Sequence, residues 1–324
     1  MDTINWGIIG CGDVTERKSG PAFNKVPNSR LVAVMRRDAA KVEDYARRHG
    51  VPKWYTDASE LINDPEVNAI YIATPPDSHE KYTLESLKAG KPVYVEKPMT
   101  LSRASAERMF NASEALQVKL TVAHYRRGLP IFNKIKELVD SKAIGEIRYA
   151  NLHMLQQYES PLITQTDDNW RVNPEISGGG LFHDLAPHQL DLMLFFFGPV
   201  KSARGISSNQ AGYYKADDIV TGEVLFENGI FFSGLWCFSV PPEEQLDLCV
   251  IMGSEGKITF SVFGNYYILS KGGKDERVEF NLPENIQHPM IGLVVDYFLD
   301  KGPNPCAGSI GIDVMNMLDR FTLR

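Results

Sequence analysis

The sequence of 324 residues lacks the features that define several classes of protein. It has only four cysteines, with neither a C-x-x-C pair nor histidines at zinc-finger spacing, namely Cys11, Cys237, Cys249 and Cys306. This pattern predicts reduced, mostly buried thiols rather than a disulfide framework or a zinc finger. No apolar run approaches the roughly 18 to 20 residues that cross a bilayer. The first residues show no basic region followed by an apolar one. We therefore expect a cytoplasmic protein without membrane contact.

Positive charge is also scarce. The chain has 34 Lys and Arg against 41 Asp and Glu, which gives a formal net charge of −7. Affinity for nucleic acid comes mainly from clustered Lys and Arg that release counterions, and the sequence has no long basic run. We expect no nucleic-acid partner.

The residues that are present predict an ordinary globular chain of two domains. Hydrophobic residues make up 43% and charged residues 23% of the sequence, and its length corresponds to about two domains. In the first third, short apolar runs alternate with segments of helical spacing. The runs cover 4–10, 31–34, 69–73, 92–95 and 119–123, and the helical segments cover 38–50, 78–89 and 101–116. Strict alternation of this kind predicts a doubly wound parallel sheet of the Rossmann type.

After residue 122 the pattern changes. A helical segment over 129–141 and a strand-like run over 147–156 precede extended segments joined by turn signals, which predict an antiparallel meander. We therefore expect an α/β protein, with a Rossmann domain that binds NAD(P) over 1–122. The region 123–324 is expected to form an α+β domain for substrate binding and oligomerisation.

A glycine-rich turn follows the first predicted strand. Gly10-Cys11-Gly12-Asp13-Val14-Thr15 matches two of the three glycine positions of the dinucleotide fingerprint. The first glycine permits a tight turn, and the second lets the backbone approach a pyrophosphate. We expect Gly10, Gly12, Asp13 and Val14 to bind the cofactor. Thr15 replaces a smaller residue and should loosen the packing slightly. The alternative is a plain glycine turn in a flavodoxin-like domain.

Two arginines stand about twenty residues further on, where a carboxylate would bind the adenosine ribose. Arg36 and Arg37 could together hold a 2′-phosphate, which favours NADP over NAD. In the alternative, both arginines are solvated and Asp38 turns to the ribose of NAD.

The motif Glu96-Lys97-Pro98 follows another predicted strand. This position places Lys97 at the carboxyl end of the sheet, where open α/β folds bind their ligands.

Asp184 and His188 belong to a second polar motif. If this segment is helical, the two residues share a face and present polar groups to one small cavity. Together with His183 and Asp191 they could also be interpreted as a metal cluster. We predict no metal.

Taken in this order, these motifs resemble the Gfo/Idh/MocA family of oxidoreductases over nearly the whole chain. The similarity rests on the glycine turn, Ala73-Thr74-Pro75-Pro76, Glu96-Lys97-Pro98, Trp170-Arg171 and the run GGG-x3-D-x3-H that begins at Gly178. It implies a C-terminal domain with a large, open, mostly antiparallel sheet, often used for oligomer contacts, and so a homodimer or homotetramer. It also implies a nicotinamide cofactor and a small carbohydrate or diol substrate: a sugar, a polyol or a trans-dihydrodiol.

The resemblance assigns roles to individual residues. Lys97, Asp184 and His188 match the catalytic residues and are also expected to contact the substrate. The expected cofactor contacts beyond the glycine turn and the two arginines are Thr74, Pro75, Pro76, His79, Glu96, Lys97, Trp170 and Arg171. Tyr125 and Arg126 are expected to line the substrate pocket, with a solvated hinge as the alternative.

The chemistry suits these residue types. Oxidation of a secondary alcohol needs a base for the hydroxyl proton, and an imidazole such as that of His188 serves near neutral pH. The ammonium group of Lys97 would stabilise the developing alkoxide, and Asp184 would orient the nicotinamide or the substrate. The sequence therefore predicts hydride transfer between a nicotinamide and a secondary alcohol or ketone. The alternative is a catalytically inactive dinucleotide-binding sensor or regulatory protein on the same fold.

Overall fold

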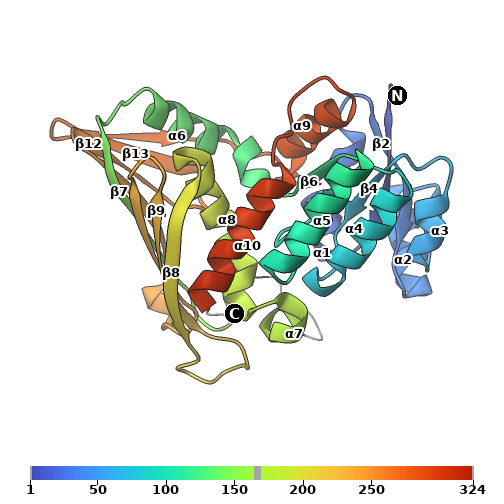
Figure 1. The fold of residues 1–324 in the computed structure, drawn as a ribbon, viewed down its shortest axis with the longest axis horizontal. Helices are drawn as coiled ribbons and strands as arrows, with labels where there is room; N and C mark the ends of the chain where they lie inside the picture. Colours follow the sequence, from blue (N-terminus) through green and yellow to red (C-terminus); the bar gives the residue numbers. More distant parts are fainter. Residues whose placement is uncertain (1, 164–168, 323–324) are drawn as a thin grey trace. The chain divides into compact units, whose positions relative to one another are not determined.

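The structure is a computed structural model that describes residues 2–163 and 169–322 and divides into two compact units (Figure 1). Unit 1 comprises residues 1–128 and 283–315, and unit 2 comprises residues 129–282 and 316–324. The domain boundary predicted from the sequence placed 283–315 in the C-terminal domain. In the structure this segment packs in unit 1, where Asn304 Nδ2 donates to the carbonyl oxygen of Leu120 at 2.9 Å.

Unit 1 contains a six-stranded sheet in the order β3-β2-β1-β4-β5-β6. Its strands are β1 (Ile4–Ile9), β2 (Ser29–Met35), β3 (Lys53–Tyr55), β4 (Ala69–Ile72), β5 (Val93–Val95) and β6 (Leu120–Val122). Every neighbouring pair is parallel, so the predicted doubly wound sheet is confirmed. Strands β4 and β5 are buried along their whole length, which explains why they are continuous apolar runs in the sequence.

Helix α2 (Ala39–His49) of unit 1 begins and ends at recognisable residues. Asp38 caps α2 by accepting a hydrogen bond from Lys41 N, and Gly50 ends it in the left-handed conformation. Helix α1 (Asp13–Arg17), which follows the glycine turn, is only five residues long and is followed by a 3-10 segment. The α-helices and 3-10 segments (η) of unit 1 are α1 (Asp13–Arg17), η1 (Gly20–Asn24), α2 (Ala39–His49), α3 (Ala58–Asn63), η2 (Pro76–Ser78), α4 (His79–Lys88), α5 (Arg103–Leu116), η3 (Tyr125–Gly128) and α9 (His288–Phe298).

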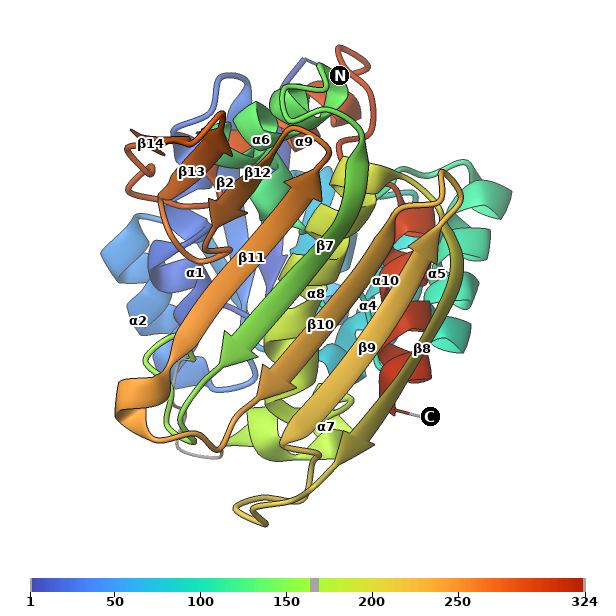
Figure 2. The ribbon, with the colours of Figure 1, turned by 90° about the vertical axis from the view of Figure 1, so that its left-hand side faces the viewer.

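Unit 2 contains an eight-stranded sheet in the order β14-β13-β12-β11-β7-β10-β9-β8 (Figure 2). Its strands are β7 (Ile147–Leu155), β8 (Val200–Ser208), β9 (Ile219–Phe226), β10 (Phe231–Cys237), β11 (Leu246–Gly253), β12 (Gly256–Phe260), β13 (Tyr266–Lys271) and β14 (Lys274–Glu279). The predicted meander needs one correction. Strand β7 lies between β10 and β11 and runs parallel to β10, because this early strand takes a central place that buries Leu152 and Met154. The other pairs are antiparallel.

One face of this sheet is covered by helix α8 (Gly180–Phe197), and the opposite face is the one seen in Figure 2. Trp236 of β10 packs against Phe182 of α8, with ring centroids 5.1 Å apart. At Gly222 an added Cβ would lie 2.1 Å from the Phe321 ring, so glycine is needed for the last helix to approach. The helices are α6 (Pro130–Asp140), η4 (Trp170–Val172), α7 (Pro174–Ser177), α8 (Gly180–Phe197), η5 (Pro242–Glu244) and α10 (Gly308–Thr322), which begins in unit 1.

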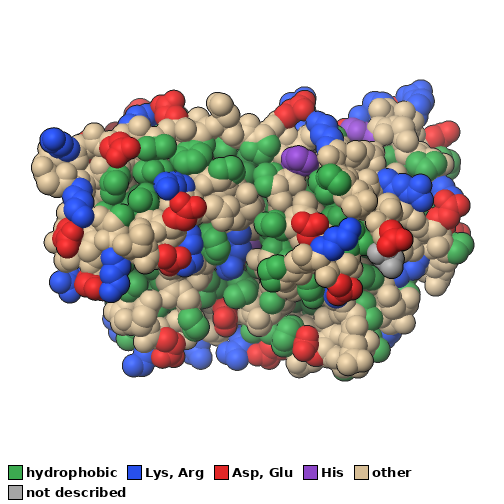
Figure 3. All heavy atoms as spheres, turned by 90° about the horizontal axis from the view of Figure 1, so that it is seen from above, with side chains coloured by type: hydrophobic (Ala, Val, Ile, Leu, Met, Phe, Trp, Pro, Cys, Tyr) green, Lys and Arg blue, Asp and Glu red, His purple; other side chains and the backbone are tan. Residues whose placement is uncertain are grey.

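The surface carries charges of both signs. On the face drawn in Figure 3, basic and acidic side chains are interspersed among apolar ones. Within the part of the chain that the structure describes, none of the helices combines the length and apolar character needed to cross a membrane.

Candidate active site

Glycine occupies positions 10 and 12 of the turn after β1 for different structural reasons. Gly10 has a φ of +94°, and a Cβ there would lie 2.7 Å from the backbone nitrogen of Thr74. Gly12 has an extended backbone, and a Cβ there would meet no protein atom within 4 Å. The fold itself therefore requires glycine at position 10. At position 12 the backbone borders open space, which suits close approach by a ligand.

The side chain of Thr15 forms a hydrogen bond within the turn. The side chain is fully buried, and its hydroxyl donates to the carbonyl oxygen of Gly12 at 2.7 Å. Its own carbonyl oxygen accepts from Tyr45 Oη at 3.0 Å. The hydroxyl thus supplies an additional bond that a glycine or alanine would lack, and the slight loosening of the packing stays a prediction.

The segment after β2 brings Arg36 to the glycine turn. Arg36 is half-buried, and its Nη1 donates to the carbonyl oxygen of Cys11 at 3.1 Å. Arg37 is exposed. The Asp38 carboxylate accepts from Lys41 N at 3.1 Å as the cap of α2. The acidic group nearest to the end of β2 is thus engaged in starting a helix.

The loop after β4 carries Thr74, Pro75 and Pro76, and the side chain of His79 contacts its backbone. His79 is fully buried, with Nδ1 3.0 Å from the Pro98 carbonyl oxygen and Nε2 2.8 Å from that of Thr74. Burial lowers the pKa of this imidazole. His79 therefore joins the loop after β4 to the loop after β5, with both ring nitrogens directed at backbone carbonyls.

Glu96 and Lys97 follow β5 at the same carboxyl edge of the parallel sheet. Lys97 is partly exposed, and the Lys97–Pro98 peptide bond is cis. Glu96 is buried, and its Oε1 accepts from Tyr71 Oη at 2.6 Å and from Gln287 Nε2 at 2.7 Å. Neither of these two donors was predicted from the sequence. Tyr71 lies on β4 within an apolar run, and Gln287 is 191 residues away in a segment with no motif.

The segment after β6 contains Tyr125 and Arg126. Both are about 6% exposed, and the Arg126 guanidinium lies 5.3 Å from the centroid of the Tyr125 ring. This burial excludes the solvated hinge for Arg126.

The remaining predicted residues lie in unit 2, on η4 and α8. Asp184 and His188 stand one turn apart on α8, as predicted. Arg171 Nε lies 3.5 Å from Asp184 Oδ2, and its guanidinium stacks 4.4 Å from the Trp170 ring centroid. His188 is buried and meets Phe263 edge-on at 5.7 Å. Unit 2 therefore brings Trp170, Arg171 and Asp184 into one cluster.

An aromatic group near the start of α8 was not predicted. The Tyr158 ring lies 5.3 Å from that of Tyr213 and 5.9 Å from that of Tyr214. A Cβ at Gly180 would approach Tyr214 and clash with Ala216, so the loop between β8 and β9 packs on the first turn of α8. The adjacent tyrosines at 213 and 214 were the available signal in the sequence.

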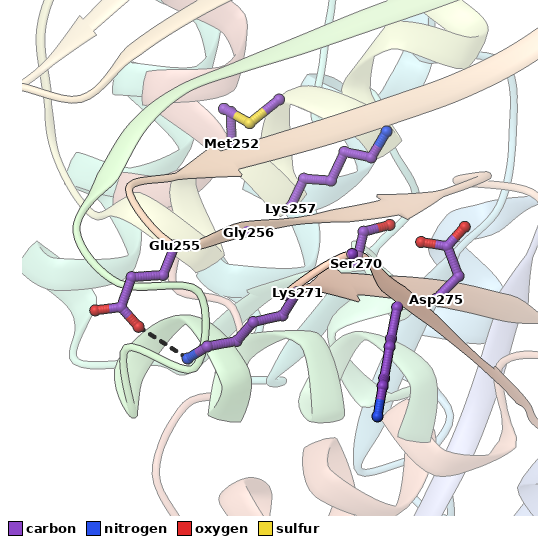
Figure 4. A pocket seen from close by; sticks show the side chains of 10 residues that line it. Met252, Glu255, Gly256, Lys257, Ser270, Lys271 and Asp275 are labelled. Atoms are coloured by element: carbon purple, nitrogen blue, oxygen red, sulfur yellow. Dashed lines mark hydrogen bonds and ion pairs between the residues drawn. The ribbon is translucent and has the colours of Figure 1, made fainter.

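Two other features of the described residues bear on ligand binding. Within 2–163 and 169–322, no three His, Cys, Asp or Glu side chains lie close enough to hold a metal ion. An open hollow of about 290 Å³ lies beside β12 and β13, where Lys271 forms an ion pair with Glu255 at 2.9 Å (Figure 4). This pair lowers the pKa of Glu255. The hollow contains no predicted site residue.

A Rossmann unit with a glycine turn and a lysine after β5, joined to a unit with a large open sheet, defines a class of dinucleotide-dependent enzymes. The sequence model of an oxidoreductase family with an NAD-binding Rossmann fold matches residues 4–124, and that of the Gfo/Idh/MocA C-terminal domain matches 132–259. Oxidoreductase P35 of Formosa agariphila is 49% identical over 318 residues, 98% of each chain. The chain therefore belongs to the Gfo/Idh/MocA family. It is an oxidoreductase, and its Rossmann domain binds a nicotinamide dinucleotide.

More distant relatives carry more specific names. The trans-1,2-dihydrobenzene-1,2-diol dehydrogenase of Oryctolagus cuniculus is 28% identical over 254 residues, which is 78% of this chain and 72% of that protein. Levoglucosan dehydrogenase in complex with NADH and levoglucosan has a TM-score of 0.85 at 19% identity, over 98% of this chain and 96% of that one. At this identity the likeness concerns the fold alone.

Proposed function

We propose that the protein transfers a hydride between NADP(H) and a secondary alcohol or ketone of a sugar, a polyol or a trans-dihydrodiol. The observation that carries the proposal is that the glycine turn, Arg36 and Lys97 all lie at the carboxyl edge of one parallel sheet, with Arg36 bound to the turn. The dihydrodiol part of the substrate class is supported by the name of the relative from Oryctolagus cuniculus, and the sugar and polyol part by the resemblance to the family. The cytoplasmic location stays a prediction.

The residues of unit 1 fit the cofactor. The open space at Gly12 accommodates a pyrophosphate against the backbone. Arg36 keeps further N–H groups beyond the one that binds Cys11, and Asp38 is engaged at its helix, so a 2′-phosphate is favoured over a free ribose hydroxyl. When bound, the nicotinamide supplies or accepts the hydride. In this proposal the glycine turn and Arg36 of residues 1–122 bind the cofactor, and residues 123–324 contribute substrate contacts in addition to that of Lys97.

The side chains supply the proton and charge chemistry. In the oxidation direction His188 takes the hydroxyl proton of the substrate as the carbon loses hydride. Lys97 places its ammonium group beside the oxygen, where negative charge develops. Asp184, restrained by Arg171, orients the imidazole or the substrate. The inactive sensor is not favoured, since such a protein needs neither the base nor the lysine.

The cofactor assignment can be tested by fluorescence titration with NADPH and, separately, NADH at equal salt. We expect tighter binding of NADPH, and Arg36→Ala should weaken it about 10- to 100-fold, because a charge-assisted hydrogen bond contributes roughly 1.5–3 kcal/mol. NADH affinity should be unchanged. Arg47→Ala removes an exposed arginine that pairs with Asp44, and it serves as the control. A preference for NADH would instead assign the ribose to Asp38 or to the backbone. Sugars, polyols and diols can then be screened as substrates by the change in absorbance of the nicotinamide.

Self-association through the open face of the eight-stranded sheet is the second part of the proposal. Register places Met252, Tyr149, Phe231 and Leu225 side by side across four strands, and Tyr149 and Phe231 are 39% and 40% exposed. A second copy of the chain is the expected occupant, because the resemblance implies oligomer contacts on this sheet.

Sedimentation equilibrium should therefore show a dimer or tetramer. The double variant Tyr149→Glu/Phe231→Glu should dissociate, because it would bury two charges in an apolar contact. Lys274→Glu on β14 is the control, since this exposed lysine lies outside the apolar row. A monomeric wild type would contradict the proposed self-association but not the proposed hydride transfer.

A further inference from the structure

A buried hydrogen-bond network surrounds Glu96 in unit 1. Its Oε1 accepts from Tyr71 Oη at 2.6 Å and from Gln287 Nε2 at 2.7 Å. Its Oε2 accepts from the backbone nitrogen of Lys97 at 3.1 Å. The three side chains at 71, 96 and 287 are each 5% exposed or less. The carboxylate is therefore held by donors on both oxygens.

The donors come from separate parts of the chain. Tyr71 lies on β4, the strand that pairs with β5. Its ring is fixed on both sides, since it lies 5.2 Å from the Tyr94 ring and 5.1 Å from the Phe23 ring. Its Oη also lies 3.1 Å from Ser19 Oγ. The phenol is thus rigidly aimed at the carboxylate.

Gln287 belongs to a short segment, residues 284–287, that is bound to the region after α1. The backbone nitrogen of Gln287 donates to the Lys18 carbonyl oxygen at 3.2 Å. Asn285 Nδ2 donates to the Arg17 carbonyl oxygen at 2.7 Å, and Lys25 Nζ donates to Asn285 Oδ1 at 2.7 Å. The segment therefore connects the region after the glycine turn with the end of β5.

This arrangement has a mechanical consequence for Lys97. A buried carboxylate is costly unless its donors hold it, so Glu96 has one favourable position. Because Oε2 accepts the Lys97 N–H, that position also restrains the peptide from which the flexible lysine side chain extends.

We propose that Tyr71 and Gln287 are positioning residues that act through Glu96 to hold the backbone of Lys97, and thereby the reach of its ammonium group. The inference rests on the proposed function, in which Lys97 stabilises the reacting oxygen. It predicts an effect on turnover rather than on cofactor affinity, because neither residue belongs to the glycine turn or to the Arg36 site.

The test uses the variants Tyr71→Phe and Gln287→Met, each of which removes a donor at nearly constant size. The control is Tyr94→Phe, on the adjacent buried ring, whose Oη lies 3.5 Å from Gln287 Oε1, at the outer limit of a hydrogen bond. With an alcohol oxidised by the wild type, each test variant should lower kcat about 10-fold or more, as expected for lost bonds to a charged group. The Kd for NADPH should stay within about twofold, and Tyr94→Phe should leave kcat within about twofold.

A double-mutant cycle separates positioning from a general loss of structure. If Tyr71 acts through Glu96, the double variant Tyr71→Phe/Glu96→Gln should have about the kcat of Glu96→Gln alone, because the two changes interrupt one path. Additive losses would overturn the proposal. A fall in kcat no larger than that of Tyr94→Phe, or a parallel loss of NADPH affinity, would also overturn it.

A second measurement needs no substrate. Trace acetylation by acetic anhydride, followed by peptide mass spectrometry, reports the reactivity of Lys97 relative to the exposed Lys88. Tyr71→Phe and Gln287→Met should change this ratio about threefold or more, and Tyr94→Phe should not. If the wild type binds NADPH but oxidises no alcohol, the proposed function fails. The reactivity ratio of Lys97 to Lys88 still tests whether Tyr71 and Gln287 position Lys97. An unchanged ratio in all variants overturns the network.

Discussion

Replacement of Lys97 or His188 by alanine should lower turnover by about 10²- to 10⁴-fold, the usual contribution of a positioned proton-transfer or charge-stabilising group. Lys97→Ala removes the ammonium group at the carboxyl edge of the sheet, and His188→Ala removes the proposed base on α8. His188→Ala should leave the Kd for NADPH within about threefold, since the glycine turn and Arg36 are untouched, whereas Lys97→Ala should also weaken NADPH binding, because Lys97 is an expected cofactor contact. Steady-state kinetics, with NADPH titration of the same preparations, would measure both quantities.

Matched controls exist for each variant. Lys88→Ala, at the end of α4, removes an exposed lysine, and His153→Ala removes an exposed histidine of β7. Neither should change turnover. The assignment of both catalytic residues would be lost if Lys97→Ala and His188→Ala remained nearly as active as the controls.

Replacement of Gly10 and, separately, of Gly12 by valine should show which glycine the stability of the fold requires and which one cofactor binding requires. Gly10→Val places a β-branched residue at a φ of +94° and against Thr74, so it should lower the free energy of unfolding by about 1–3 kcal/mol or more. Gly12→Val meets no protein atom within 4 Å, so the melting temperature should hold. NADPH affinity should nevertheless fall about 10-fold or more, which corresponds to 1.4 kcal/mol.

Thermal denaturation and NADPH titration of both valine variants provide the comparison. Gly50→Ala, at the end of α2, is the control for a left-handed glycine away from the site, and it should cost stability without affecting NADPH. Unchanged NADPH affinity in Gly12→Val would remove the pyrophosphate from this turn.

Local patterns carried most of the fold of unit 1. The parallel sheet follows from buried apolar runs alternating with amphipathic helices, and such periodicity depends only on neighbours in the sequence. Short elements such as β3 and α3 escaped prediction because three to six residues give too little pattern. The central position of β7, parallel to β10, was also not predictable, since pairing between distant strands is a tertiary choice.

The candidate site shows the same limit. The glycine turn, Arg36, Lys97, Asp184 and His188 are all predictable, because each motif is contiguous or spans one helical turn. The bracing hydroxyl of Thr15 and the carbonyl partners of His79 depend on loops that meet only after folding.

The sequence by itself determined the class of the protein: a dinucleotide turn after a buried strand, a lysine after another, and an acid and a histidine one helical turn apart. Only the tertiary structure decided what holds these groups. It showed that the fold needs Gly10 while Gly12 borders open space, and that Asp38 is engaged as a helix cap. It also brought Gln287 to Glu96 across 191 residues of chain. The physical reason is that a buried carboxylate must find donors wherever the packed chain supplies them, and no local pattern records that position.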